Sequence, residues 1–191
     1  MSKKFKYPLM SNAFNSQDIK VGIDVLRSKF ITMSNITYNF EKYFAKKIGS
    51  KYAVMTNSGS SANLLAISCL TNPLSINRLT NGDEVIIPAV CWSTSLWPLI
   101  QNNLKPVFAD VELDTFNLDL DKIEEKITKK TKAVMLVHVL GMSTNMDRLK
   151  KIIKKHNLIL IEDACESLGA SYNKKKLGTI GKFGTYSFYY S

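Results

Sequence analysis

One stretch, residues 158–166 with the sequence LILIEDACE, constrains the fold of this chain more than any other. Its four consecutive aliphatic residues are typical of a strand that is buried on both faces of a parallel sheet. Two carboxylates, Glu162 and Asp163, follow where such a strand would leave the core. Because ligands of open α/β sheets bind outside the carboxyl ends of the strands, Asp163 is a candidate to hold a cationic partner. A solvated turn that merely begins with acids is the alternative.

Strands and helices alternate along most of the chain. Core strands are expected at 52–56, 84–87, 106–110, 131–138 and 158–161. Helices are expected at 16–30, 38–48, 64–70, 120–127 and 145–156, with one more that opens within 89–95. This order predicts an α/β fold of three αβα layers with a mainly parallel sheet, in one domain over residues 1–191. Residues 185–191 are again strand-like and end the chain abruptly, so we expect the N-terminal part of a longer protein.

The composition argues against several classes of protein. No apolar run approaches the ~20 residues of a membrane span, and residues 1–8 lack the apolar core of a secretory signal. The three cysteines, Cys69, Cys91 and Cys165, are far apart, which favours reduced cytosolic thiols over disulfides. The two histidines form no ligand cluster with them. We therefore expect a cytoplasmic protein that binds no metal and contacts no membrane.

The net charge of +10 leaves nucleic-acid binding as one interpretation. Nearly all the basic residues are lysines spread along the chain, and the densest groups lie at 129–130, 150–151, 154–155 and 174–176. Such spacing favours a solvated lysine-rich surface, so we expect no nucleic-acid partner. Attraction for a small anionic substrate stays open.

Two further segments carry candidate binding residues. In NSGSSAN at 57–63, Gly59 would let the backbone approach a ligand, and Ser60 would offer a hydroxyl and an N–H at a helix N-terminus. Plain N-capping by serine is the alternative. Trp92 lies just past a strand end and could stack on a planar ring, although packing of its helix onto the sheet is the simpler role.

These motifs in this order resemble the DegT/StrS-type sugar aminotransferase family. The resemblance rests on SGSSANL at 58–64, the segment 88–92, PVFAD at 106–110, the two acids of 162–163 and GTYSF at 184–188. It implies pyridoxal-phosphate enzymes of the aspartate-aminotransferase fold (fold type I), which modify keto sugars carried on nucleotides. It also implies a homodimer at full length, and a large cofactor-binding domain that is cut here before the small C-terminal domain.

The resemblance assigns roles to individual residues. Gly59 and Ser60 match the turn that holds the cofactor phosphate, and the hydroxyl of Ser187 also touches that phosphate. Trp92 matches the aromatic residue that stacks on the pyridine ring. Asp163 matches the acid that keeps the pyridine nitrogen protonated, so that the ring accepts electrons. Finally, Glu166 falls near the ring, where many members have Gln or His.

The resemblance places the residue that decides the reaction just after Ser191, so no catalytic residue is expected within the chain. A lysine there forms the Schiff base of an aminotransferase. A histidine there marks the sugar 3-dehydratases, which use the pyridoxamine form of the cofactor to remove the 3-hydroxyl of a 4-keto sugar. The segments 58–66, 98–102 with 106–108, and 114–119 resemble that branch most. A non-catalytic α/β module, receiver-like or a remnant without the Schiff-base residue, is the alternative.

Overall fold

The structure is a computed structural model that describes residues 13–189. The described chain divides into two compact units, residues 13–55 with Tyr189, and Thr56–Phe188. The expected absence of a signal in residues 1–8 lies outside the described residues.

The first unit contains the two predicted N-terminal helices, α1 (Ser16–Arg27) and α2 (Asn35–Ile48). A capping box of Asn15 and Asp18 starts α1, and α2 ends at Gly49, whose φ of 82° is left-handed. The predicted strand at 52–56 does not form and was wrong. Its residues include exposed Tyr52 and Val54, and no strand pairs with it within the described chain, so strand propensity finds no ladder.

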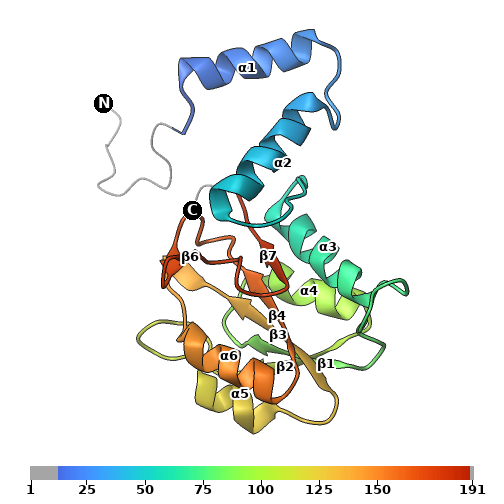
Figure 1. Ribbon diagram of the computed structural model, residues 1–191, viewed down its shortest axis with the longest axis vertical. Coiled ribbons are helices and arrows are strands. Elements are labelled where there is room, and N and C mark those ends of the chain that lie inside the picture. The colour runs from blue at the N-terminus through green and yellow to red at the C-terminus, as the bar shows by residue number, and fades with distance from the viewer. Residues whose placement is uncertain (1–12, 190–191) are drawn as a thin grey trace, which may run out of the picture. The chain divides into compact units, whose positions relative to one another are not determined.

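The second unit is built on a five-stranded sheet in which every neighbouring pair is parallel (Figure 1). The strand order is β2-β1-β3-β4-β7. The strands are β1 (Glu84–Pro88), β2 (Lys105–Ala109), β3 (Thr131–Val137), β4 (Ile159–Asp163) and β7 (Phe183–Thr185). This arrangement confirms the predicted α/β fold with a mainly parallel sheet.

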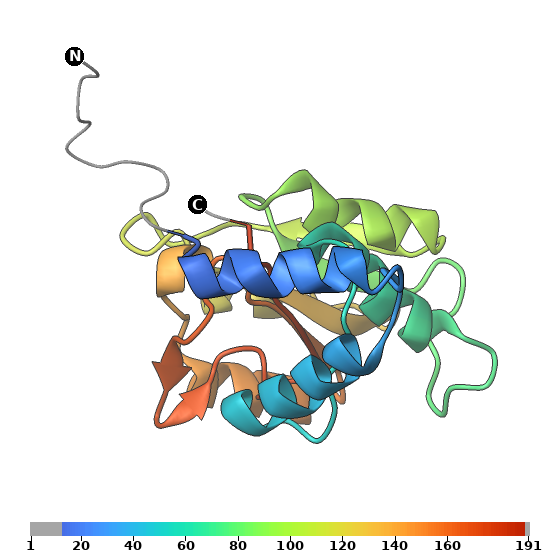
Figure 2. The ribbon, with the colours of Figure 1, turned by 90° about the horizontal axis from the view of Figure 1, so that it is seen from above.

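Helices cover both faces of this sheet (Figures 1 and 2). On one face α3 (Gly59–Thr71) and α4 (Ser93–Gln101) pack against odd-numbered residues of β1, β3 and β4, such as Ile161. On the other face α5 (Leu120–Lys126) and α6 (Met146–Lys155) pack against even-numbered residues, such as Leu160. Side chains alternate along a strand, so neighbouring residues of β4 serve different layers.

The segment after β4 contains the short antiparallel pieces expected there. There, β5 (Ser171–Tyr172) pairs with the antiparallel β6 (Lys175–Lys176). Before β4, between β3 and α6, the chain forms a 3-10 turn, η1 (Val139–Gly141). The terminal strand expected at 185–191 was wrong beyond Thr185 among the described residues, because β7 begins two residues earlier and ends where its partner β4 ends. Ser187 therefore lies just beyond the strand and not on it, while residues 190–191 lie outside the described range.

Candidate functional site

Asp163 is buried at the carboxyl end of β4, with 4% of its surface exposed. Its Oδ2 accepts hydrogen bonds from Ser95 Oγ at 2.7 Å and from Asn63 Nδ2 at 2.8 Å. Its Oδ1 accepts one from the Cys165 N–H at 3.1 Å. The solvated turn considered from the sequence was therefore wrong. Within residues 13–189 Asp163 forms no ion pair, so its charge is held by neutral donors alone.

Asn63 joins four elements around this carboxylate. Its Nδ2 also reaches the Thr94 carbonyl oxygen at 3.3 Å, and its Oδ1 accepts from Thr185 Oγ1 at 2.6 Å. Because a carboxylate only accepts, the Nδ2 atom must face Asp163, and this fixes the orientation of the amide. The sequence reasoning missed Asn63 and Ser95. The available signal, for Asn63 alone, was an amide side chain directly before the apolar run 64–67 of the same helix.

The N-terminus of α3 lies beside this network. Ser58 caps the helix, its Oγ accepting from the Ser61 N–H at 3.1 Å. Gly59 is buried, and a Cβ there would lie 2.7 Å from Cys165 Sγ and 3.0 Å from Ser187 Cβ. Ser60 Oγ donates to Thr94 Oγ1 at 3.0 Å. The structure thus brings Gly59 and Ser187 together at a helix N-terminus, where backbone N–H groups favour an anion.

Trp92 immediately precedes α4, three residues before the Ser95 that binds Asp163. Its side chain is 71% exposed, so packing of α4 onto the sheet is not its role. A large exposed aromatic face so close in sequence to Ser95 is available to cover a planar ligand.

Glu166 is exposed on the loop after β4. Its Oε2 accepts from the Leu140 N–H of η1 at 3.3 Å, a contact separate from the donors of Asp163. The position of Glu166 near the cofactor ring, which the resemblance implies, stays a prediction.

The charge of Asp163 affects the pKa of two cysteine thiols, Cys91 and Cys165, which the sequence alone did not place near the site. Burial, and then the Asp163 charge, raises the pKa of the Cys91 thiol. The same two causes raise the pKa of the Cys165 thiol more strongly. Both thiols therefore stay protonated near neutral pH and are poor nucleophiles.

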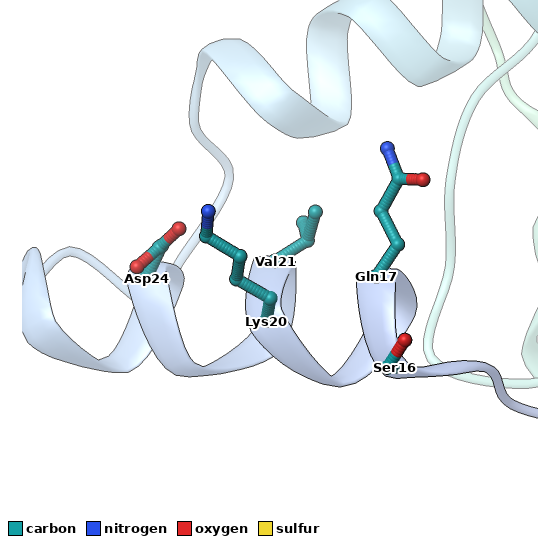
Figure 3. Close-up of a pocket in the computed structure, with 5 residues that line it drawn as sticks. All are labelled: Ser16, Gln17, Lys20, Val21 and Asp24. Atoms are coloured by element: carbon teal, nitrogen blue, oxygen red, sulfur yellow. The ribbon is translucent and has the colours of Figure 1, made fainter.

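Other features of the described chain offer no competing centre. Residues 13–189 contain no group of three or more His, Cys, Asp or Glu side chains arranged to hold a metal ion. No helix in the same range combines the length and apolar character needed to cross a membrane. A hollow along α1 is lined by Ser16, Gln17, Lys20, Val21 and Asp24, and none of the predicted site residues lines it (Figure 3).

The arrangement can therefore hold a ligand with three properties. The buried carboxylate suits a cationic group, the helix N-terminus with its serines suits an anion, and the exposed indole suits a flat ring.

Solved structures provide close matches. The Escherichia coli GDP-4-keto-6-deoxy-D-mannose-3-dehydratase with bound hydrated PLP has a TM-score of 0.91, with 45% identity over 97% of this chain and 47% of that one. A His-to-Asn variant of GDP-4-keto-6-deoxymannose-3-dehydratase (ColD) with bound GDP-perosamine has a TM-score of 0.92. It is 45% identical, and the match covers 97% of this chain and 48% of that one. A ColD variant with adjacent Ser-to-Asn and His-to-Lys changes has a TM-score of 0.90. It is 44% identical, and the match covers 94% of this chain and 47% of that one.

The most similar protein sequences include enzymes of the same kinds as these solved structures. GDP-4-keto-6-deoxy-D-mannose 3-dehydratase of Escherichia coli O55:H7 is 45% identical over 188 residues, which are 97% of this chain and 47% of that protein. GDP-perosamine synthase of Caulobacter vibrioides is 39% identical over 150 residues, 78% of this chain and 38% of that protein. The chain thus spans about half the length, or less, of the curated relatives it matches. Residues 13–191 match the DegT/DnrJ/EryC1/StrS aminotransferase family, to which the chain therefore belongs.

Proposed function

We propose that this chain is the cofactor-binding large domain of an enzyme that uses pyridoxal or pyridoxamine phosphate to modify a nucleotide-linked keto sugar. The observation that carries the proposal is the environment of Asp163. Within the described chain, this buried carboxylate accepts hydrogen bonds from neutral donors only. A buried charge is costly unless it is paired, so a cationic ligand accounts for its retention. The 45% identity to a sugar 3-dehydratase supports the same assignment.

The residues fit this cofactor. Asp163 would pair with the protonated ring nitrogen, and Trp92 would cover one face of the ring. Gly59, Ser60 and Ser187 would hold the phosphate, since Gly59 has no Cβ to fill the space before Ser187. Glu166 would lie near the ring.

When bound, the cofactor supplies a pyridinium ring that accepts electrons from the bond being broken. Asp163 keeps the proton on the ring nitrogen, because the ionised carboxylate stabilises the cation beside it. Asn63 and Ser95 hold Oδ2 in place, so the carboxylate does not reorient toward water. Trp92 excludes water from the ring face it covers.

Between the two reactions of the family, we propose 3-dehydration over amino transfer. The ColD variant with adjacent Ser-to-Asn and His-to-Lys changes implies a Ser-His pair in the parent enzyme. Ser191 would correspond to that serine, and the next residue would then be histidine. A histidine can move protons but cannot form the Schiff base that lysine forms.

The names of the relatives support a proposal for the substrate and the setting. The GDP-linked sugars in their names favour a GDP-linked 4-keto-6-deoxy sugar as the substrate. Another relative, from Salmonella typhimurium, is named lipopolysaccharide biosynthesis protein RfbH, which favours a role in surface polysaccharide synthesis. We also propose a cytoplasmic homodimer without a nucleic-acid or membrane partner.

The non-catalytic alternative has less support. A receiver-like phosphoacceptor must be accessible, whereas Asp163 is 4% exposed. A remnant without its catalytic residue remains the runner-up, and the codon after Ser191 tests it. Lysine there would favour amino transfer, and a stop codon would favour the remnant.

The direct test incubates the complete gene product with pyridoxamine phosphate and GDP-4-keto-6-deoxymannose, followed by mass spectrometry. The proposal expects a sugar that has lost its 3-hydroxyl. An amino sugar would instead support amino transfer, and an unchanged substrate would contradict both reactions.

A further inference from the structure

A second buried carboxylate, Glu162, is used by no step proposed above. It precedes Asp163 on β4 and is fully buried. Neighbouring residues of a strand point to opposite faces, so Glu162 lies on the α5–α6 side while Asp163 lies on the α3–α4 side. Its function must therefore be exerted on the other layer.

The carboxylate of Glu162 organises one short segment of backbone. Its Oε1 accepts from the N–H groups of Ile180, at 2.7 Å, and Gly181. Its Oε2 accepts from the Gly178 N–H at 3.0 Å and pairs with His138 Nε2 at 2.9 Å. Burial would raise the pKa of Glu162, but the bonds from His138, Gly181 and Gly178 outweigh it and lower the pKa below its ordinary value of 4.5. Glu162 is therefore charged, and charged acceptors form the stronger hydrogen bonds.

His138 completes this set of donors. It is fully buried, and its Nδ1 is the buried side-chain atom without a partner within the described chain. A bare nitrogen acceptor costs less to bury than an unpaired charged N–H. The contact with Glu162 therefore favours the tautomer in which Nε2 carries the proton and donates it.

The segment that Glu162 holds leads directly to the site. The Lys182 N–H donates to the Leu160 carbonyl at 2.8 Å, and β7 then pairs with β4 through Thr185 opposite Asp163. Beyond β7, Tyr186 returns to the same segment, where its hydroxyl donates to the Leu177 carbonyl at 2.7 Å. The next residue is Ser187, which lies against Gly59.

The packing in this segment leaves little freedom. A Cβ on Gly184 would overlap the Gly178 carbonyl, and one on Gly178 would overlap the Tyr186 ring. A Cβ on Gly181 would lie 2.6 Å from the Leu160 carbonyl oxygen. Displacement of residues 178–181 would therefore be passed on to β7 and to Ser187.

We propose that Glu162 is a positioning residue: by fixing residues 178–181 it sets Ser187 against Gly59 as a preformed receptor for the cofactor phosphate. This inference rests on the proposed function, because it concerns the same phosphate. It assigns separate tasks to the two adjacent acids. Asp163 acts on the ring nitrogen, and Glu162 acts on the phosphate through the backbone.

The test compares two ligands that differ only in the phosphate, pyridoxamine 5'-phosphate and pyridoxamine, on the complete gene product. In Glu162→Gln, an amide N–H₂ replaces one carboxylate oxygen and faces N–H donors. We expect pyridoxamine phosphate to bind about tenfold more weakly, with pyridoxamine affected less than about twofold. A merely structural role would weaken both ligands equally, and that result, or no change in either, overturns the proposal.

Glu84→Gln is the matched control, because Glu84 is also a buried glutamate with several hydrogen bonds but starts β1 at the other end of the sheet. It should leave the ratio of the two dissociation constants unchanged. If Glu162→Gln does not fold, Tyr186→Phe is measured in its place, with the same ratio of dissociation constants as the readout. We expect Tyr186→Phe to bind pyridoxamine phosphate about threefold more weakly and pyridoxamine as well as before.

A double variant sharpens the test. Glu162→Gln combined with Ser187→Ala should bind pyridoxamine phosphate no more weakly than Ser187→Ala alone, because Glu162 acts through Ser187. Fully additive losses would overturn the proposal. Failure of the wild-type protein to bind pyridoxamine phosphate would overturn the proposed function as well, so the two failures are distinguishable.

Discussion

Two buried carboxylates at opposite ends of the sheet differ in what surrounds them. Glu84 starts β1, and its Oε1 pairs with Lys105 Nζ at 3.0 Å while its Oε2 accepts from Thr128 Oγ1 at 2.6 Å. Asp163 ends β4 and accepts from neutral groups only, within the described chain. Within the described residues, Glu84 therefore has a cationic partner and Asp163 has none.

We propose that this difference separates a stabilising acid, Glu84, from a binding acid, Asp163. The hydrogen bond from Thr128, followed by that from Lys105, lowers the pKa of Glu84 below its ordinary value of 4.5. Its ionised form is therefore favoured by folding itself. The charge of Asp163 is solvated by Asn63 and Ser95 but not neutralised, which leaves it to attract a cationic ligand.

The largest effect is expected from Asp163→Asn. Loss of a buried charged partner should weaken cofactor binding about 100-fold. The cofactor-free protein should lose less stability than Glu84→Gln does, because removal of an unpaired buried charge offsets the hydrogen-bond acceptor that is lost. Absorbance titration and thermal unfolding measure the two quantities. Asp110→Asn is the control, an exposed acid that also follows a strand, and retained affinity in Asp163→Asn would contradict the comparison.

Gly59→Ala should have the next largest effect. The new Cβ would lie 2.7 Å from Cys165 Sγ and 3.0 Å from Ser187 Cβ, so the proposed phosphate receptor would have to shift. We expect about tenfold weaker cofactor binding from this overpacking. Gly22→Ala provides the contrast, since nothing lies within 4 Å of that Cβ and alanine suits the interior of α1. Equal affinity of the two variants would argue against the receptor.

Glu84→Gln should act on stability and not on binding. Loss of hydrogen bonds to a buried carboxylate should lower the free energy of unfolding by about 1–3 kcal/mol at neutral pH. Because the folded-state pKa is lowered, this contribution is present above the unfolded pKa and lost as the pH falls through the folded value. Denaturant unfolding between about pH 3 and pH 7 should show the two proteins converge in acid. A difference that widens in acid would contradict the assignment.

Trp92→Ala should give the smallest effect. The side chain is 71% exposed, so stability should change by less than about 0.5 kcal/mol. Loss of ring stacking should still weaken cofactor binding about threefold to tenfold, and Trp92→Phe should restore part of it. Unchanged affinity in both variants would remove Trp92 from the site.

The sequence predicted elements whose signal is local. Aliphatic runs and helical spacing located β4, β3, α5 and α6, whereas α3 begins at Gly59, five residues before the helix expected at 64–70. The strand expected at 52–56 failed because a strand also needs a neighbour, which local residues do not encode.

The site itself was predictable only in part. Gly59 and Ser187 meet as the resemblance implied. The partners of Asp163 were not predictable, because Asn63 and Ser95 lie 100 and 68 residues away and their polarity also suits a solvated helix start. The contrast between Glu162 and Asp163 depends on which face each occupies. That became clear only once β4 was seen to include both residues.

The most direct measurement concerns the proton that Asp163 is proposed to hold. A cofactor with an isotopically labelled ring nitrogen, bound to the complete gene product, would report protonation of that nitrogen by NMR. We expect a protonated nitrogen in the wild-type protein near pH 8 and a neutral one in Asp163→Asn, because the free ring loses its proton in that range without an anionic partner. A neutral nitrogen in the wild-type protein, or a protonated one in Asp163→Asn, would contradict this expectation.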